Sequence, residues 1–285
     1  MEAYIEVVRR SLLTSAPRDY VGVLDRIHKE LLPRTYLEIG VADGTSFRVT
    51  QPGTVRVGVD PRPKIVLPDD PLTHLLTATS DDFFSSYDLR QLLGGATVDL
   101  VFIDGMHLFE YALRDFMNVE PFCHPRSVIL FHDCCPIDAA TSTREPTPGK
   151  WSGDVWKVLV ALREYRPELR FATIDVPPTG LSVVTGVDPS SAIVRERYGE
   201  IVDELSDIDY SVLSSAKAET LNLVPNDWNA VRALLPPPFR TGRSARPARR
   251  RIAVERCCRG VRRRVAASPA APVSHGLKRR LFPGH

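Results

Sequence analysis

The chain has 285 residues, of which 43% are hydrophobic and 25% charged, so it can bury the core of one large domain. It contains no run of about 18 apolar residues, so we expect no membrane-spanning helix. Its first residues lack the basic-then-apolar order of a signal peptide. The 5 cysteines form no CxxC pair and no disulfide-like spacing, and we therefore expect a cytoplasmic protein.

Charge is distributed unevenly along the chain. Residues 241–285 contain 12 arginines, one lysine and a single acid, Glu255, whereas residues 1–240 contain 24 basic and 34 acidic side chains. Because the tail also lacks hydrophobic periodicity, we predict one domain at 1–240 and a basic, disordered tail at 241–285. The acidic body argues against nucleic-acid binding by the domain itself.

Two explanations of the tail stay open. It could be a functional basic arm, or the product of a frameshift near Arg240–Arg246 in a GC-rich gene, since arginine, alanine, proline and glycine are the residues of GC-rich codons. Reading the nucleotide sequence in the other frames distinguishes the two explanations.

The hydrophobic pattern predicts seven strands, with amphipathic segments between most of them. Near-continuous apolar runs, such as residues 98–103 and 127–131, are typical of strands that are buried on both faces. This alternation indicates a parallel α/β sheet. The predicted strands are residues 35–40, 54–60, 74–80, 98–104, 127–133, 169–176 and 180–187, and helices are predicted along 20–31, 106–119, 155–165 and 191–205.

One connection breaks the alternation. The sixth and seventh strands are joined only by residues 177–180, whereas a parallel crossover needs about a dozen residues or more. The last strand must therefore run antiparallel to its predecessor. We predict an α/β fold with a Rossmann-like, doubly wound, mostly parallel seven-stranded sheet and an antiparallel last strand.

The first strand ends in a glycine turn, from Gly40 to Gly44, and the second strand ends in Asp60. A strand that stops at a glycine turn lets the backbone come close to a ligand. Asp60 lies 22 residues after Glu38, where a carboxylate usually holds a ribose diol. This pattern predicts a nucleotide-type cofactor, although the turn lacks the third glycine of an NAD-binding motif.

Three motifs carry a resemblance to a known family over roughly residues 20–190. The chain resembles class I S-adenosylmethionine (SAM)-dependent methyltransferases, which share the antiparallel last strand. More narrowly, it resembles the subgroup that contains many sugar and natural-product O-methyltransferases. The motifs are Glu38-Ile-Gly-Val-Ala-Asp-Gly-Thr-Ser46, Ile103-Asp-Gly-Met-His107 and the pair His132-Asp133.

The resemblance implies roles for the residues near the first two strands. Gly40 and Gly44 would let the turn approach the methionine part of SAM, and Glu38 would support the turn or the ammonium group. Asp60 would accept both ribose hydroxyls, because a carboxylate is a bidentate acceptor. Each of these residues also has a purely structural alternative. The glycines could form an ordinary strand-to-helix turn, and Asp60 could be a turn aspartate before a proline.

The third strand is followed by Ser80 and Asp81, which lie beside the adenine in the resembled family. A side chain here could accept a hydrogen bond from the exocyclic amine. The alternative is an N-cap for the helix that contains Phe83, since serine and aspartate favour that position.

The fourth and fifth strands supply the predicted catalytic residues. Asp104 stands at the carboxyl end of its strand, where ligands bind in open α/β sheets, and it could also contact the SAM amino group. His107 is the preferred general base because a neutral imidazole can accept a proton near neutral pH. His132 competes for the same role, and Asp115 is expected to be structural or solvated.

Asp104 and Asp133 could also bind a divalent metal, with Mg2+ the natural choice for carboxylate ligands. A metal would hold the acceptor hydroxyl and lower its pKa. Metal-dependent relatives usually offer a third acid or amide where this chain has His132, so a metal-free mechanism stays open beside the metal-assisted one.

Two further features have competing interpretations. Zinc would need cysteine pairs separated by two to four residues, so Cys123, Cys134 and Cys135 are expected to be buried thiols. The segment Trp151–Trp156 follows a loop at 136–150 on the same edge of the sheet. Its tryptophans could stack on the acceptor or anchor the following helix.

The predicted function is a SAM-dependent methyltransferase, with O-methylation of a small hydroxylated acceptor such as a sugar or secondary metabolite. N-methylation is not excluded. An RNA methyltransferase that uses the basic tail is one alternative, and a SAM-binding protein without turnover is another. The expected partner is the small acceptor, without membrane and without nucleic acid, and a homo-oligomer is compatible with the sequence.

Overall fold

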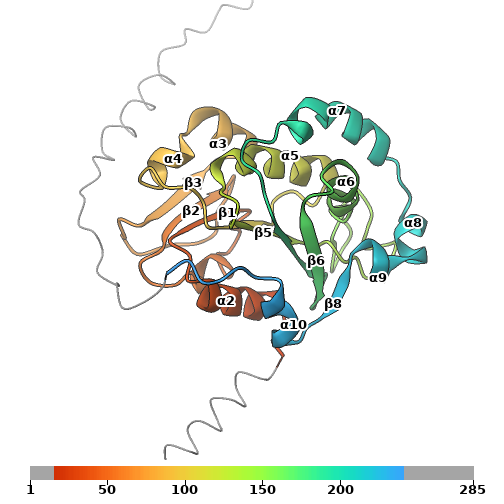
Figure 1. The fold of residues 1–285 in the computed structure, drawn as a ribbon, viewed down its shortest axis with the longest axis horizontal. Helices are drawn as coiled ribbons and strands as arrows, with labels where there is room; N and C mark the ends of the chain where they lie inside the picture. Colours follow the sequence, from red (N-terminus) through yellow and green to blue (C-terminus); the bar gives the residue numbers. More distant parts are fainter. Residues whose placement is uncertain (1–15, 241–285) are drawn as a thin grey trace, which may run out of the picture. The chain divides into compact units, whose positions relative to one another are not determined.

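A computed structural model describes residues 16–240, in which one eight-stranded sheet lies between two layers of helices (Figure 1). The predicted tail at 241–285 lies outside the described residues, so the proposed domain boundary stays a prediction. The strands are β1 (Thr35–Ile39), β2 (Val55–Asp60), β3 (Thr73–Thr77), β4 (Leu100–Ile103), β5 (Val128–His132), β6 (Arg170–Asp175), β7 (Leu181–Thr185) and β8 (Leu223–Pro225). The helices are α2 (Tyr20–Leu31), α3 (Ser80–Ser86), α4 (Leu89–Leu92), α5 (Phe109–Val119), α6 (Lys157–Tyr165), α7 (Ile193–Leu205), α8 (Tyr210–Ser215), α9 (Lys217–Thr220) and α10 (Trp228–Ala233).

The strand order across the sheet is β3-β2-β1-β4-β5-β7-β6-β8. Strands β1 to β5 pair in parallel, and β7 is antiparallel to both of its neighbours, β5 and β6. The predicted Rossmann-like, mostly parallel sheet with an antiparallel seventh strand is therefore confirmed. The short strand β8, which pairs in parallel with β6 at the edge, is an eighth strand that the sequence analysis did not predict.

Alternate residues of the central strands enter opposite sides of the sheet. Leu37 of β1 and Val101 of β4 belong to the core on the side of α5 and α6, whereas Tyr36 and Phe102 belong to the core on the side of α2 and α10. Figure 1 shows these helices on the two sides of the sheet. Burial on both faces explains the near-continuous apolar runs of these strands.

Capping interactions set the starts of two helices that reach the candidate site. The side chain of Asp19 accepts the backbone N–H of Gly22 and caps α2. Helix α5 has no cap of its own, and Asp154, which lies 45 residues later, accepts the N–H of Phe109 at 2.8 Å. Among residues 16–240, no helix has both the length and the hydropathy that crossing a membrane requires.

The parallel arrangement brings four chain segments to one edge of the sheet. The carboxyl ends of β1, β2, β4 and β5 are followed or closed by Gly40, Asp60, Asp104 and Asp133. The register pairs Ile39 with both Val59 and Ile103, so these ends lie level with one another. The candidate site is built at this edge, as in other open α/β sheets.

Candidate functional site

Gly40 and Gly44 fix the turn that follows β1. Both have positive φ, 88° and 76°, which glycine adopts without strain. A Cβ on Gly40 would lie 1.9 Å from the carbonyl oxygen of Asp104, and a Cβ on Gly44 would lie 1.9 Å from Cδ1 of Ile65. The two glycines are thus required for packing within the protein, in addition to the ligand contact that remains a prediction.

Glu38 is fully buried beneath this turn. Its carboxylate accepts hydrogen bonds from the hydroxyl of Tyr36 and from Oγ of Ser46, each at 2.6 Å. Burial raises the pKa of Glu38 to about 8, although both hydroxyls oppose the shift. Of the two predicted roles, support of the turn is the one that these contacts favour.

Asp60 connects the end of β2 to the same turn. Its Oδ2 accepts the backbone N–H of Ala42 at 2.8 Å, and its Oδ1 accepts the N–H of Arg62 at 2.7 Å. Each carboxylate oxygen has two lone pairs, so Asp60 keeps acceptor capacity for a diol. The geometry is compatible with the ribose contact, which stays a prediction.

Ser80 and Asp81 begin α3, but neither caps it. The N-cap is Thr79, whose side chain accepts the N–H of Asp82, so the capping alternative was placed one residue too late. Asp81 instead forms an ion pair with Arg114 of α5 at 2.8 Å. An adenine contact for Ser80 and Asp81 stays a prediction.

Asp115 lies behind this region and is buried, not solvated. Its Oδ1 has no hydrogen-bond partner among the described residues. Burial raises the pKa of Asp115 to about 7, against an opposing hydrogen-bond contribution from Ser80. The carboxyl group is therefore easily protonated near neutral pH, which is unusual for an aspartate.

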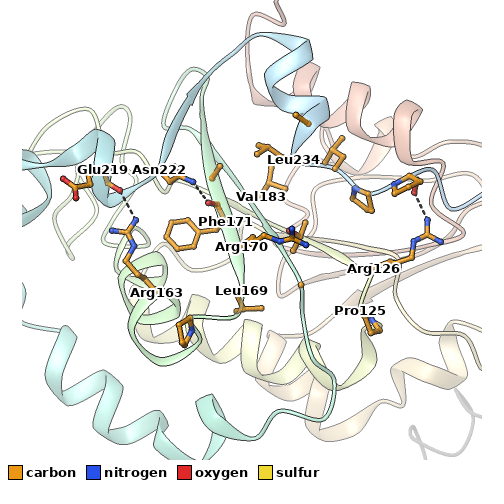
Figure 2. Close-up of a pocket in the computed structure, with 18 residues that line it drawn as sticks. Pro125, Arg126, Arg163, Leu169, Arg170, Phe171, Val183, Glu219, Asn222 and Leu234 are labelled. Carbon is orange, nitrogen blue, oxygen red and sulfur yellow. Dashed lines mark hydrogen bonds between the residues drawn. The ribbon is translucent and has the colours of Figure 1, made fainter.

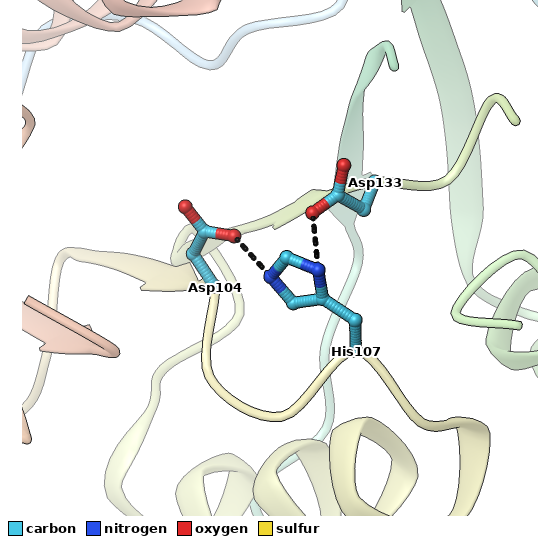
Figure 3. A group of neighbouring side chains, drawn as sticks. All are labelled: Asp104, His107 and Asp133. Carbon is cyan, nitrogen blue, oxygen red and sulfur yellow. Dashed lines mark ion pairs between the residues drawn. The ribbon is translucent and has the colours of Figure 1, made fainter. Parts of the chain in front are cut away.

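Asp104, His107 and Asp133 form one cluster at the carboxyl edge (Figure 3). Nε2 of His107 lies 3.4 Å from Oδ1 of Asp104, and Nδ1 lies 3.1 Å from Oδ2 of Asp133. The carbonyl oxygen of Trp151 also lies 3.1 Å from Nδ1. Because a carbonyl can only accept, Nδ1 carries the proton, and Nε2 is the atom that can take a proton when the ring is neutral.

His132 joins the same cluster from the end of β5. Its Nδ1 lies 3.1 Å from Oδ1 of Asp104 and 3.2 Å from Oδ2 of Asp133. Its ring packs against Tyr20 of α2, with centroids 3.9 Å apart. Its Nε2 is buried and has no partner in the described part of the chain. The structure thus brings both candidate bases to the same pair of carboxylates.

Contacts within the cluster shift the pKa values of His107, His132 and Asp104. Burial alone would lower the pKa of both histidines, but their contacts with Asp104 and Asp133 raise it to about 9 for His107 and about 10 for His132. Burial alone would raise the pKa of Asp104, but the two imidazoles hold it well below its usual range. The raised pKa values favour the protonated form of both histidines near neutral pH.

The cluster also has the spacing and the ligand atoms that could hold a divalent metal. One ligand atom from each of Asp104, His107 and Asp133 lies within 4.8 Å of the others. Two carboxylate oxygens and an imidazole are a suitable donor set for a divalent cation. Asp104 and Asp133 were the predicted metal ligands, and the structure adds His107 to this set.

The structure adds residues that the sequence analysis did not assign to the site. Tyr20 is the first residue of the helix predicted along 20–31, and its ring covers His132. Thr179, from the β6–β7 connection, donates a hydrogen bond to Oδ1 of Asp133. Only the spatial packing of α2 and the β6–β7 hairpin reveals these contacts, since neither segment carries a motif.

The two tryptophans of the 151–156 segment behave differently. Trp151 stacks on the ring of His107, with centroids 5.2 Å apart and planes 23° apart. Trp156 is 1% exposed and packs in the core beside α6. Trp151 therefore lies at the candidate site, where a stacking contact with the acceptor stays a prediction, whereas the burial of Trp156 agrees with the anchoring interpretation.

The cysteines of the described region are buried free thiols. Cys123, Cys134 and Cys135 lie outside the metal-compatible cluster found among residues 16–240. Burial raises the pKa of Cys123 to about 12, which keeps its thiol protonated. These observations agree with the expectation of buried thiols.

A cavity of about 830 Å³ lies at the opposite edge of the sheet, near the start of β6 (Figure 2). Its lining includes Arg126, Arg163 and Arg170. Arg126 and Arg163 donate to backbone carbonyls of Pro237 and Glu219 and so fasten the surrounding segments. This cavity holds none of the predicted site residues, and the chemistry is concentrated at the carboxyl edge instead.

A family model for a methyltransferase domain matches residues 37–134. The match begins in β1 and ends just after Asp133, so it contains the glycine turn, Asp60 and the whole Asp104–His107–His132–Asp133 cluster. Over these residues the chain is thus similar to a methyltransferase domain. The sheet around them is Rossmann-like, with the antiparallel strand β7 lying between β5 and β6, which both run in the parallel direction.

One similar curated protein is the uncharacterized protein y4gI of Sinorhizobium fredii. It is 40% identical over 76 residues, which are 27% of this chain and 7% of that protein. The match thus involves only a small part of that relative.

Several solved structures match part of this chain at low sequence identity. They include a cofactor-bound protein, Rv0187, from MTB, with 16% identity, 65% of this chain and 90% of that chain covered, and a TM-score of 0.45. An O-methyltransferase from Bacillus cereus in complex with SAH has 12% identity, coverage of 66% and 90%, and a TM-score of 0.43. The O-methyltransferase TomG from Streptomyces achromogenes, in complex with SAM, has 16% identity, coverage of 65% and 96%, and a TM-score of 0.40.

Proposed function

We propose that this domain is a methyltransferase that uses SAM and methylates an oxygen of a small hydroxylated acceptor, such as a sugar or secondary metabolite. The observation that carries the proposal is the contact between the glycine turn after β1 and the end of β4, where the proposed catalytic residues begin. Gly40 touches the carbonyl of Asp104, and three residues later His107 faces two carboxylates. A cofactor on the turn would thus lie beside a group that can move a proton.

The residues at this edge fit SAM. Asp60 has free acceptor capacity for the ribose, the turn from Gly40 to Gly44 offers backbone for the methionine part, and Ser80 and Asp81 follow β3 on the adenine side. When bound, SAM supplies a methyl group on a sulfonium, which is already a good leaving group. The protein then needs to align the acceptor and remove its proton.

His107 is the proposed proton acceptor. Its Nδ1–H is held between the Trp151 carbonyl and Asp133, which leaves Nε2 as the basic atom. Asp104 lies beside Nε2 and stabilises the imidazolium that forms when the proton is taken. An acceptor must bind while His107 is neutral, so the raised pKa favours turnover at alkaline pH. His132, whose Nε2 is unpartnered, is the second candidate for the base.

A bound Mg2+ is the alternative way to activate the acceptor. Asp104, His107 and Asp133 would hold the ion, which would act as a Lewis acid on the acceptor hydroxyl. His107 would then be a ligand, and its proton would have to leave before the metal bound. The metal-free and metal-assisted mechanisms share the same residues and are separated by chelation.

Other acceptors and roles are less well supported. RNA methylation would depend on the tail at 241–285, which lies outside the described residues. A SAM-binding protein without turnover would not need the two histidines between Asp104 and Asp133. N-methylation would need less help from a base. A cytoplasmic location and a homo-oligomer stay predictions.

The test is transfer of a radiolabelled methyl group from SAM to a panel of sugars, phenolic metabolites, amines and RNA. We expect label on hydroxylated small molecules in the wild-type chain and none in a His107→Ala, His132→Ala double variant that still binds SAM. Label on RNA that disappears when residues 241–285 are removed would support the RNA alternative. Label on amines alone would contradict O-methylation.

A further inference from the structure

The segment Trp151–Asp154 encloses His107 on several sides. The carbonyl oxygen and the ring of Trp151 contact its imidazole. Gly153, with φ of 58°, lies so close that a Cβ would be 1.6 Å from the carbonyl oxygen of His107. The N–H of Asp154 donates to the same carbonyl at 3.3 Å. The backbone, the tautomer and the ring orientation of His107 therefore all depend on this segment.

Asp154 joins the segment to two helices. Its side chain is 2% exposed. Oδ1 accepts the N–H of Phe109 at the start of α5, and Oδ2 contacts Nη1 of Arg144 at 2.7 Å and Nζ of Lys157 at 3.1 Å. A buried carboxylate with three charged or N–H partners has a fixed position, because any displacement leaves buried charges unpaired.

Arg144 closes this network from the loop that follows β5. Its guanidinium donates to both oxygens of Glu110, at 2.6 and 3.1 Å, and to Asp154. Glu110 lies in the first turn of α5, three residues after His107. Such bidentate contacts between arginine and carboxylates are strong and directional. The loop is thus tied to the first turn of α5, which begins two residues after the proposed base.

We propose that Arg144 and Asp154 are positioning residues for His107. They hold the Trp151–Asp154 segment against the imidazole, so that Nδ1–H is donated to Trp151 and Nε2 faces Asp104. Because the loop at 136–150 leads into this segment, the order of the loop and the orientation of the base are coupled. This inference rests on the proposed function only for its consequence in catalysis, since the contacts themselves need neither SAM nor acceptor.

The first experiment uses the full chain without ligands. The ring nitrogen resonances of His107, assigned with a His107→Gln variant and recorded above its pKa of about 9, where the ring is neutral, report the tautomer. The amide exchange of Phe109 reports the bond to Asp154. We expect Arg144→Ala to change the His107 ring shifts and to speed Phe109 exchange about tenfold or more. Arg144→Lys should restore part of the effect, because it keeps the charge but loses the bidentate geometry.

Arg197→Ala is the matched control, since Arg197 is an exposed arginine paired with Glu200 on α7. It should leave both readouts unchanged. Unchanged His107 shifts and unchanged Phe109 exchange in Arg144→Ala would overturn the positioning role.

Asp154→Asn is a second test variant, since asparagine keeps an acceptor for Phe109 but loses the charge that pairs with Arg144. If it folds, it should show the same His107 shifts as Arg144→Ala.

Activity separates this inference from the proposed function. With an acceptor in hand, Arg144→Ala should lower kcat and leave the affinity for SAM unchanged, because Arg144 contacts none of the proposed cofactor residues. Equal losses of SAM affinity and kcat would indicate general disruption and contradict the positioning role. Failure of the wild-type chain to bind SAM would remove the proposed function and leave the ring-shift result intact.

Discussion

Gly40 lies against the backbone carbonyl of Asp104, in a contact that no side chain could share. A Cβ at Gly40 would lie 1.9 Å from the Asp104 carbonyl oxygen and 2.8 Å from Cα of Gly105. The contact joins the turn after β1 to the end of β4, where the proposed catalytic residues begin. The positions of the cofactor turn and the catalytic cluster are therefore coupled through the backbone alone.

Gly40→Ala should disrupt this junction. The substitution adds left-handed strain and also an overlap that only a shift of β4 relieves, and overpacking of this kind costs about 1–3 kcal/mol beyond the strain. Gly95→Ala is a matched control, since Gly95 has φ of 87° and nothing within 4 Å of its added Cβ. Urea unfolding should show the larger loss in Gly40→Ala, and equal losses in the two variants would contradict the overlap.

The pH dependence of stability should reveal the buried Asp115. Its pKa is about 7 in the folded chain against an ordinary 3.8, so the fold favours the protonated carboxyl. The associated stability is complete below pH 3.8 and is lost as the pH rises through 7. Relative to Asp115→Asn, the wild type should therefore lose melting temperature between pH 5 and pH 8.

Asp69→Asn is the control for this experiment, because Asp69 is exposed and the substitution removes the same charge. The difference between Asp69→Asn and wild type should stay constant over the same pH range. A constant difference for Asp115→Asn as well would show that Asp115 titrates as an ordinary aspartate.

The chain should tolerate loss of residues 241–285. A chain that ends at Arg240 keeps the last contacts that the structure describes, in which the N–H of Phe239 donates to Leu31 and Arg240 donates to Pro33 and Thr54. We expect an unchanged melting temperature and SAM affinity. A chain that ends at Pro236 loses these contacts and should melt at a lower temperature. A large drop in the chain that ends at Arg240 would show that the tail stabilises the domain.

Removing the proposed base should separate catalysis from binding. His107→Ala should reduce turnover about 10²–10⁴-fold while the affinity for SAM stays nearly the same, because the ring is outside the proposed cofactor contacts. If a metal activates the acceptor, EDTA should abolish activity and Asp133→Ala should have the same effect. A fully active His107→Ala variant that is also insensitive to EDTA would exclude both mechanisms and leave His132 or simple positioning.

The strands were predictable because burial on both faces leaves a continuous apolar signature. All seven predicted strands are present, with ends that differ by at most three residues. The eighth, β8, was missed because it has three residues and contains Pro225, so its pairing with β6 has no sequence signal. The start of α5 was predicted at 106 but lies at Phe109, where Asp154 provides the cap.

The site was predictable where it depends on strand ends. Topology alone brings together the ends of the adjacent parallel strands β4 and β5. At or just after these ends lie Asp104, His107, His132 and Asp133. The contacts of Tyr20 with His132 and of Asp154 with Phe109 depend on how a helix and a loop pack, which no motif specifies. Asp115 was expected to be structural or solvated, and its burial is visible only once α3 and α5 are in place.

The binding of SAM itself is the most direct test. Calorimetric titration of the full chain should show saturable, one-site binding, and Asp60→Ala should weaken it about 10–100-fold, since a hydrogen bond to a charged group contributes about 1.5–3 kcal/mol. Asp69→Ala should bind like the wild type. Absence of saturable SAM binding by the wild-type chain would contradict the proposed function as a SAM-dependent methyltransferase.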